Sequence, residues 1–380
     1  MNTRPVIESP NEHAALSVTF NTDCSRFVVG LDTGFRIFHS DTSQLQTAKT
    51  FHGGLGLVQM MGNANYLALV GGGRSPKYPQ NKVIIWDDSK DKIALELATL
   101  TAVRGVQISK SRIAVVLQNS VRVYAFQRPP QPLARYETAD NFLGLCCLTE
   151  KYLVFPGRTA GHVQVVQLAT DSVSIIPAHS SSLGALQLSA DGELLATASE
   201  KGTIIRIFST SSCAKLGERR RGTEFATVYS LRFSPSGNML ACTSDKGSLH
   251  IFDVPNPRKA RPVSPIPGAQ GSSNTDATNK WGFLSNLPFG PFSDVYSFAS
   301  TSFETGEEPL LPSPARAIER GDNTVLGTSR PMKGVIGWAD ETTVIVVGAG
   351  IDARWEKFVL KEEDGRTVIF REGWKRYLAN

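Results

Sequence analysis

The sequence predicts an all-β protein, a seven-bladed β-propeller of the WD type that forms one closed domain over residues 1–380, and three observations lead to this prediction. Similar segments of alternating apolar and polar residues recur along the chain. The ends of their third strands are spaced 40 to 48 residues apart, the period of propeller blades with four short strands. A length of 380 residues with 41% hydrophobic residues also suits one large all-β unit.

The clearest copies of the repeat lie at 18–41, 186–210 and 231–254. Each copy has an alternating strand, a polar turn, a strand of small and apolar residues, a turn that contains glycine, and a strand that ends in Ile-Phe. This order is typical of antiparallel strands joined by hairpins. The three copies therefore predict three blades of the same construction.

Weaker copies at 66–88, 106–126 and 143–168 fill the gaps, and Trp86-Asp87 supplies one WD dipeptide. The predicted third strands end at Phe38, Trp86, Phe126, Leu168, Phe208 and Phe252. A seventh unit at 334–370 alternates as strongly as the others and turns at Asp364-Gly365. We therefore prefer seven blades to six blades with a tail. The sequence leaves open whether the ring closes through an N-terminal or a C-terminal strand.

Two insertions interrupt the period, and both are predicted to be exposed and mobile. The first, 255–294, falls in blade six, and the second, 303–331, is rich in Pro, Gly, Ser and Glu. The first carries three cations followed by an aromatic and leucine-rich run: Arg258, Lys259, Arg261, then Trp281, Phe283, Leu284, Leu287, Phe289 and Phe292. Aromatic residues beside cations suit a membrane interface. The alternative is that they cover a blade edge as part of the core.

Composition is that of an ordinary globular protein, with a formal net charge of +5 from 40 basic and 35 acidic residues, and it argues against a polycation. The N-terminus shows no secretory signal and no segment reaches about 18 apolar residues, so we expect a cytoplasmic protein. Five cysteines without a C-x-x-C pair are predicted to be reduced thiols, with no metal or cofactor: Cys24, Cys146, Cys147, Cys213 and Cys242.

Three consecutive arginines, Arg219 to Arg221, precede Gly222 between two predicted blades. They should lie on or beside an outer strand, where alternation would point Arg220 and Arg221 into different grooves. The aligned turns add possible phosphate donors from the unit before, His179, Ser199, Lys201 and Arg206, and from the unit after, Thr223, Thr243, Ser244, Lys246 and His250. Alternatively, the arginines are solvated surface and the hydroxyls bond their own turns.

These residues make the chain resemble the PROPPIN family, the WIPI-type seven-bladed propellers that bind phosphoinositides. The family motif is an aromatic residue or leucine followed by Arg-Arg-Gly, which Arg220, Arg221 and Gly222 match, whereas Arg219 occupies the apolar slot. Segments 178–208 and 226–252 resemble the family's fifth and sixth blades, and the sequence at 67–88 resembles the shorter WIPI-type subgroup. The resemblance covers nearly the whole chain except the two insertions.

The resemblance implies binding of phosphatidylinositol 3-phosphate and phosphatidylinositol 3,5-bisphosphate at two rim sites. Site one would use His179, Ser199, Lys201, Arg206 and Arg220. Site two would use Arg221, Thr223, Thr243, Ser244, Lys246 and His250. The family's membrane-inserting loop matches 255–294. The resemblance also implies peripheral location on autophagosome-precursor, endosomal or vacuolar membranes, and recruitment of the autophagy lipid-transfer rod protein, for which 71–82 is the nearest candidate surface; alternatively, 71–82 is only a long hairpin.

Other functions are less well supported by the sequence. A P-loop ending, an H-E-x-x-H and a G-x-S-x-G are all missing, and Cys213 lacks the C-x5-R arrangement of a phosphatase, so we expect no enzyme. Arginine clusters also bind nucleic acid, but we expect no nucleic-acid partner, and a monomer in solution. The main alternative is a WD-repeat protein-interaction scaffold without a lipid ligand.

Overall fold

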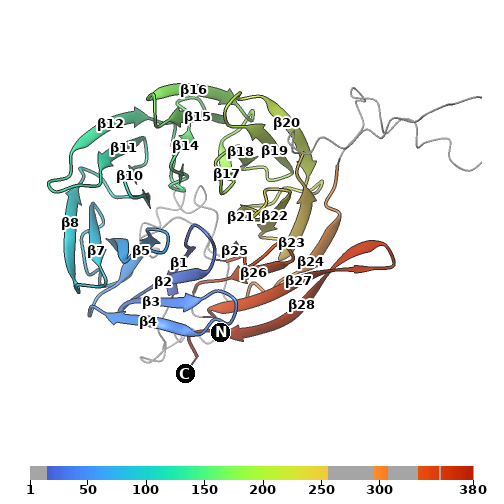
Figure 1. Cartoon of the computed structure of the whole chain (residues 1–380), viewed down its shortest axis with the longest axis horizontal. Coiled ribbons are helices and arrows are strands. Elements are labelled where there is room, and N and C mark those ends of the chain that lie inside the picture. Colours follow the sequence, from blue (N-terminus) through green and yellow to red (C-terminus); the bar gives the residue numbers. More distant parts are fainter. Residues whose placement is uncertain (1–14, 256–294, 307–332, 351, 380) are drawn as a thin grey trace, which may run out of the picture.

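The computed structural model describes residues 15–255, 295–306, 333–350 and 352–379, and every structural statement below concerns these residues. Seven antiparallel sheets of four strands stand around a central axis like the blades of a propeller (Figure 1). Within each sheet the strands follow chain order, with the first strand at the centre and the fourth at the rim. The predicted seven-bladed, all-β ring is confirmed.

We number the blades in chain order. Blade one has β1 (Ala15–Phe20), β2 (Arg26–Leu31), β3 (Gly34–His39) and β4 (Leu45–Thr50). Blade two has β5 (Leu55–Met60), β6 (Tyr66–Gly71), β7 (Lys82–Asp87) and β8 (Lys92–Ala98). Blade three has β9 (Gly105–Ile108), β10 (Arg112–Val116), β11 (Ser120–Ala125) and β12 (Pro132–Glu137). Blade four has β13 (Cys147–Leu148), β14 (Tyr152–Pro156), β15 (His162–Gln167) and β16 (Ser172–Pro177).

The remaining blades follow the same order. Blade five has β17 (Leu183–Leu188), β18 (Leu194–Ser199), β19 (Ile204–Ser209) and β20 (Lys215–Arg220). Blade six has β21 (Val228–Phe233), β22 (Met239–Ser244), β23 (Ser248–Asp253) and β24 (Ala299–Ser302). Blade seven has β25 (Val335–Trp338), β26 (Thr343–Val347), β27 (Arg354–Glu363) and β28 (Arg366–Arg376). Since the seventh unit is a complete sheet, the alternative of six blades with a tail is wrong.

The chain between β23 and β24, which are neighbours in one sheet, contains the first predicted insertion. Residues 256–294 of that insertion lie outside the described residues, as do residues 307–332 of the second. The aromatic and leucine-rich run predicted to contact membranes is therefore outside them as well: Trp281, Phe283, Leu284, Leu287, Phe289 and Phe292.

Apolar side chains fill the spaces between neighbouring blades, because each middle strand is covered on both faces. In β19, Ile205 and Ile207 point toward blade six and contact a cluster that contains Leu240 and Cys242. The residue between the two isoleucines, Arg206, must then point the other way, toward blade four. This alternation decides which groove each polar side chain enters.

The ring closes without a strand shared between its first and last blades. Ala15 and Gly350 exchange two backbone hydrogen bonds of 3.1 and 2.8 Å, and the Trp355 indole donates to the carbonyl of Ser40 at 2.7 Å. The buried ring of Tyr377 packs against Phe27 and Phe38, with centroids 5.3 and 5.2 Å apart. Closure therefore depends on side chains that blade seven places against blade one.

The five cysteines are free thiols; Cys24, Cys146 and Cys242 are buried, whereas Cys147 and Cys213 are half-buried. Within the described residues, no three His, Cys, Asp or Glu side chains are grouped as metal ligands. Across the same residues, no helix has the length and hydropathy needed to cross a membrane.

Candidate functional site

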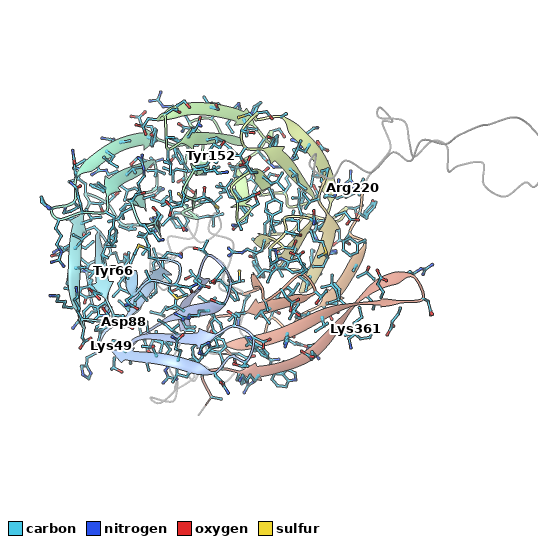
Figure 2. All side chains as sticks on the ribbon, viewed as in Figure 1. Lys49, Tyr66, Asp88, Tyr152, Arg220 and Lys361 are labelled. Atoms are coloured by element: carbon cyan, nitrogen blue, oxygen red, sulfur yellow. The ribbon has the colours of Figure 1, made fainter. Side chains whose placement is uncertain are left out.

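The three arginines lie at the rim of the ring, at the end of the outer strand β20. The backbone N–H of Arg220 donates to the carbonyl of Val295 at 2.9 Å, and Arg220 forms a β-bridge with Tyr296. Arg220 is therefore beside the chain that leads into β24, and Figure 2 shows its side chain at this edge of the ring.

The arginines alternate between the two faces of blade five. Nε of Arg219 donates to the carbonyl of Asp253 in blade six at 2.6 Å, and the charge of Arg221 acts on His250, also in blade six. Arg220 points the opposite way, onto the face that it shares with Glu218 and Arg206. As predicted, Arg220 and Arg221 enter different grooves.

The groove between blades four and five, here called groove 4/5, contains a neutral histidine and a paired arginine. Nε2 of His179 lies 2.9 Å from the hydroxyl of Thr197. Nη1 of Arg206 donates to the carbonyl of Ala178 at 2.5 Å, and its Nε donates to Glu218 Oε1 at 2.9 Å. The sequence prediction missed Thr197 and Glu218, although alternation from Arg220 places Glu218 on the same face.

Charges in groove 4/5 are arranged around that glutamate. Burial and then the Arg206 charge lower the pKa of His179 to about 4, so its imidazole is neutral at pH 7. Burial raises the pKa of Glu218, but the Lys215 hydrogen bond at 2.8 Å and the Arg206 charge outweigh this effect and lower it. In the absence of ligand, Glu218 therefore neutralises the cation that the groove would offer to an anion.

Two other predicted residues of site one lie at the turn between β18 and β19. Ser199 is buried, and its carbonyl accepts the Gly202 N–H at 2.9 Å. Lys201 is exposed, and its carbonyl accepts the Ala226 N–H at 3.1 Å. Ser199 pairs with Leu183, a few residues after His179, so the turn stands at the same end of the groove.

The groove between blades five and six, here called groove 5/6, has a buried arginine at its centre. Nε of Arg221 donates to the carbonyl of Gly202 at 2.6 Å, and Nη2 donates to the carbonyl of Glu224 at 2.6 Å. His250 contacts the hydroxyls of Ser248 at 3.0 Å and Ser297 at 3.1 Å. Burial first, and then Arg221, lower the pKa of His250.

The other predicted residues of site two divide between this groove and its surroundings. The Ser244 hydroxyl lies 3.3 Å from that of Ser248, while Thr223 and Lys246 are exposed, with Lys246 paired to Glu224 at 3.2 Å. Thr243 points elsewhere: its hydroxyl donates to Gly334, at the start of blade seven, at 2.5 Å. Alternation along β22 causes this, because its neighbour Cys242 packs toward blade five.

The two grooves have equivalent frameworks and different charges. Arg206 is opposite Thr197 in the sheet, and His250 is opposite Cys242, so they occupy the same place in successive blades. On the outer strand, Arg206 is paired with Glu218, whereas His250 is paired with Ser300. Groove 5/6 thus has a hydroxyl where groove 4/5 has a carboxylate.

Exposed apolar side chains surround the arginines at the rim. Phe225 is 70% exposed, and Val295, Tyr296 and Phe298 are 43%, 52% and 37% exposed. Sequence reasoning missed these four, although three of them directly follow the predicted aromatic run. Together they extend an apolar border along the edge of blades five and six.

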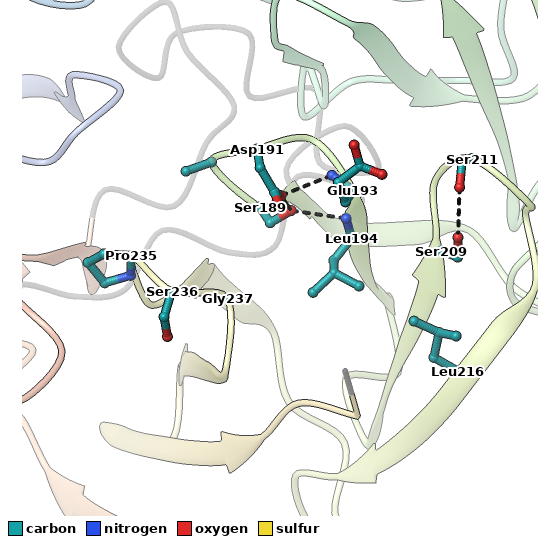
Figure 3. A pocket seen from close by; sticks show the side chains of 11 residues that line it. Ser189, Asp191, Glu193, Leu194, Ser209, Ser211, Leu216, Pro235, Ser236 and Gly237 are labelled. Atoms are coloured by element: carbon teal, nitrogen blue, oxygen red, sulfur yellow. Dashed lines mark hydrogen bonds between the residues drawn. The ribbon is translucent and has the colours of Figure 1, made fainter. Parts of the chain in front are cut away.

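Two cavities lie away from the grooves. One of about 280 Å³ lies between blades five and six and is lined by Ser189, Asp191, Leu194 and Ser236 among others (Figure 3). Leu194 begins β18 and Ser199 ends it, so this cavity is at the opposite end of the strand from the grooves. The other, of about 430 Å³, is the central channel, lined mainly by the first strands. Neither cavity contains a predicted site residue.

The candidate partner surface at 71–82 connects β6 with β7. It folds back on the preceding connection, where Gly54 donates to the Ser75 carbonyl at 2.7 Å and Lys77 donates to the Gly54 carbonyl at 3.0 Å. Arg74 and Lys77 are exposed on it. The segment is therefore a loop fixed by backbone hydrogen bonds to Gly54, with Arg74 and Lys77 exposed on it.

Comparison with protein families gives a match to the PROPPIN family model over residues 14–281. A relative called SVP1-like protein 2, from Emericella nidulans, is 56% identical over 325 residues, which cover 84% of this chain and 99% of the relative. Autophagy-related protein 18e of Arabidopsis thaliana is 30% identical, with 96% of this chain and 88% of the relative covered.

Among solved structures, Kluyveromyces lactis Hsv2 with its complete loop 6CD matches with a TM-score of 0.74 at 21% identity, covering 96% of this chain and 99% of that chain. A complex described as KlAtg21 with the coiled-coil of AgAtg16 matches with a TM-score of 0.65 at 18% identity, covering 96% and 99%. At these identities the structures show a shared fold.

Proposed function

The chain belongs to the PROPPIN family, and from this premise we propose that it is a phosphoinositide-binding membrane-recruitment protein that acts as an adaptor in autophagy. Its ligands are phosphatidylinositol 3-phosphate and phosphatidylinositol 3,5-bisphosphate. One observation carries this proposal: Arg220 points into groove 4/5 and Arg221 into groove 5/6. Each groove also contains a basic residue at the same position of its blade, Arg206 in one and His250 in the other. The proposal requires no chemical step.

Each groove binds one headgroup in this proposal. Groove 4/5 uses His179, Ser199, Lys201, Arg206 and Arg220, and groove 5/6 uses Arg221, Thr223, Ser244, Lys246 and His250, with Thr243 supporting the fold from the far face. Arginine forks and the lysines supply charge-assisted hydrogen bonds to ring phosphates. In groove 4/5 the headgroup must compete with Glu218 for Arg206, because that carboxylate already accepts from its Nε.

Membrane attachment combines headgroup binding with burial of apolar side chains. Each cation near an anionic leaflet contributes about 1 kcal/mol, which is weak and sensitive to salt. Burial adds about 25 cal/mol per Å² of apolar area. We propose that the aromatic run at 281–292 inserts, and that exposed Phe225, Tyr296 and Phe298 reach the interface beside it.

The proposed partner is the autophagy lipid-transfer rod protein, bound at the loop 71–82. The exposed Arg74 and Lys77 support an interaction surface there. The complex of KlAtg21 with the coiled-coil of AgAtg16 supports partner binding by this fold. The proposed location is the cytoplasmic surface of autophagosome-precursor, endosomal or vacuolar membranes.

The test is flotation with liposomes that contain phosphatidylinositol 3-phosphate, the 3,5-bisphosphate, the 4-phosphate or phosphatidylserine at matched surface charge. Wild type should float with the 3-phosphorylated lipids, and Arg220→Gln/Arg221→Gln should not. The matched control is Lys92→Gln/Lys110→Gln, which removes two exposed charges from blades two and three. Equal binding to every anionic lipid, or full binding by the arginine variant, would favour a WD-repeat scaffold without a lipid ligand.

A further inference from the structure

The groove between blades two and three, here called groove 2/3, repeats the polar position of the two rim grooves. In β11, Val121 and Val123 pack toward blade four, and Arg122 between them points toward blade two. Arg206 in β19 and His250 in β23 have the same place, each between two apolar residues that pack toward the next blade. Arg122 is therefore the blade-three counterpart of the basic residues in grooves 4/5 and 5/6.

The outer strand places a second arginine directly opposite the first. Arg122 pairs with Arg135 of β12, whereas the corresponding Arg206 pairs with Glu218. Directly opposite side chains have Cβ atoms about 5 Å apart, and like charges at that separation destabilise a sheet. Neither arginine forms an ion pair within the described part of the chain, and Nε of Arg122 is buried there without a hydrogen-bond partner. The pair therefore lacks the counter-charge that Glu218 supplies in blade five.

A third arginine, Arg104, lies outside groove 2/3, beside the connection from blade three to blade four. Arg104 directly precedes β9, and its Nη2 donates to Oε1 of Gln118 at 3.4 Å. Gln118 belongs to the turn between β10 and β11, the turn that carries Lys201 in blade five. Burial lowers the pKa of Arg104 against the opposing effect of Asp140, and its guanidinium lies 4.4 Å from the centre of the Phe142 ring.

We propose that groove 2/3 is a third anion-binding site, specific for a phosphate group that bridges Arg122 and Arg135. A phosphate can accept two arginine forks at once, which removes the repulsion between the opposed guanidinium groups. Blades two and three lie across the ring from β20 and β24 (Figure 1), so a membrane docked at blades five and six leaves this groove in solution. The expected ligand is therefore a soluble phosphorylated molecule.

The experiment uses Arg220→Gln/Arg221→Gln as the background, so that groove 2/3 is measured apart from the two rim grooves. Isothermal titration calorimetry with inositol hexakisphosphate should show one bound molecule per chain. Adding Arg122→Gln should weaken binding about tenfold or more, since charge-assisted hydrogen bonds are lost. The matched control is Arg36→Gln, which changes the counterpart arginine of blade one, paired there with Ala48. No binding in the background, or an equal effect of both variants, overturns the proposal.

A second variant separates binding from folding. Arg135→Glu copies the Arg206 and Glu218 pairing of blade five, so it should abolish binding without lowering the midpoint of thermal unfolding. If Arg135→Glu does not fold, Arg122→Lys is measured in its place. Its binding should be intermediate, because lysine keeps the charge but lacks the forked guanidinium. Full binding by Arg135→Glu contradicts the proposal.

The source of the phosphate is tested in parallel arms. Soluble inositol hexakisphosphate and vesicles with phosphatidylinositol 3-phosphate are both offered to the background variant, and binding to either that depends on Arg122 supports the site and names its source. A tetraglutamate peptide is the third arm. Binding of the peptide through Arg122 without binding of either phosphate ligand would overturn the proposal in favour of an acidic protein segment. Flotation of the wild-type protein tests lipid binding at grooves 4/5 and 5/6, whereas calorimetry on the background variant tests groove 2/3. Either proposal can therefore be disproved without the other.

Discussion

At the scale of single residues, Glu218 makes the two rim grooves unequal. It accepts from Arg206 and Lys215 in groove 4/5, at the position where groove 5/6 has Ser300. An anion that enters groove 4/5 must break this pairing, whereas groove 5/6 presents Arg221 bonded only to carbonyls in the described structure. We therefore expect groove 5/6 to bind the headgroup more tightly.

Glu218→Gln should strengthen binding in groove 4/5 by about three- to fivefold, a modest gain because the pair is partly exposed and screened. The measurement is calorimetry with inositol 1,3-bisphosphate in an Arg221→Gln/Arg122→Gln background, which leaves groove 4/5 as the one intact groove of the three proposed. Glu363→Gln, at the exposed β27–β28 hairpin, is the control for charge. Unchanged or weaker binding by Glu218→Gln would mean that the carboxylate does not compete with the ligand.

His179 should make stability depend on pH. Its folded pKa of about 4 is below the ordinary 6.5, so the unfolded chain binds more protons between these values. The contribution is fully present above pH 6.5 and is lost as the pH falls toward 4, by on the order of 2 kcal/mol. Urea unfolding at pH 7 and pH 5 should show a larger loss for wild type than for His179→Gln. Equal losses would show that the imidazole is not held neutral.

The residue types in the grooves could be predicted from the sequence better than their contacts. The arginine run was visible directly in the sequence, and the repeat alignment assigned His179 to the groove before it and His250 to the groove after it. It placed Thr243 in groove 5/6, but the face of a residue depends on strand register, and a shift of one position reverses it. The bond from Arg219 to the Asp253 carbonyl joins residues of two blades and leaves no local pattern in the sequence.

At the scale of the element, Arg219 occupies a buried position in β20 that the family motif fills with an apolar residue. Burial lowers its pKa, and its guanidinium donates to the carbonyls of Asp253 and Glu218. Arg219→Leu should keep stability within about 1 kcal/mol of wild type, since a buried polar group can be replaced by an apolar one of similar size. Arg219→Ala should lose about 2 kcal/mol by leaving a cavity and an unpaired carbonyl.

Chemical unfolding of both variants tests this difference, with the exposed Arg366→Ala as control. A leucine variant as unstable as the alanine variant would show that the arginine bonds themselves hold β20 against blade six.

Element prediction succeeded where the pattern was long. The third strands of the first six blades end within two residues of their predicted ends, because alternation runs through each of them. It failed for β24, whose four residues Ala299–Ser302 carry little hydrophobic pattern, and for β28, which continues to Arg376, beyond the predicted end at 370. The short β24 forms through pairing with β23, and hydrogen bonds to the long β27 extend β28; such pairing is not encoded locally.

At the scale of the whole molecule, the count of seven blades followed from the repeat, but the way the ring closes did not. Closure rests on Tyr377, which lies after the last strand and contacts Phe27, Phe38 and the Gly348 carbonyl, the last at 2.9 Å. Its role arises from residues that are far apart in sequence. No repeat period could have revealed it.

Tyr377→Ala should destabilise the protein by about 3 to 5 kcal/mol, because it removes a buried aromatic ring from the joint between blades one and seven. Tyr377→Phe keeps the ring and should cost about 1 kcal/mol for the lost hydrogen bond. Thermal unfolding measures both, with Tyr296→Ala as the exposed control. A small effect of the alanine variant would mean that the backbone bonds between Ala15 and Gly350 hold the ring closed without it.

Closure without a shared strand means that every blade consists of consecutive residues. A ribosome therefore releases finished blades one after another, and each can pack on its predecessor as it emerges. The face of blade one that contains Phe27 and Phe38 stays uncovered during synthesis until blade seven and Tyr377 have been made. The same arrangement packs Tyr377, which follows the last strand, against Phe27 and Phe38 of blade one, so the chain could be linked there and reopened between two other blades as a circular permutant.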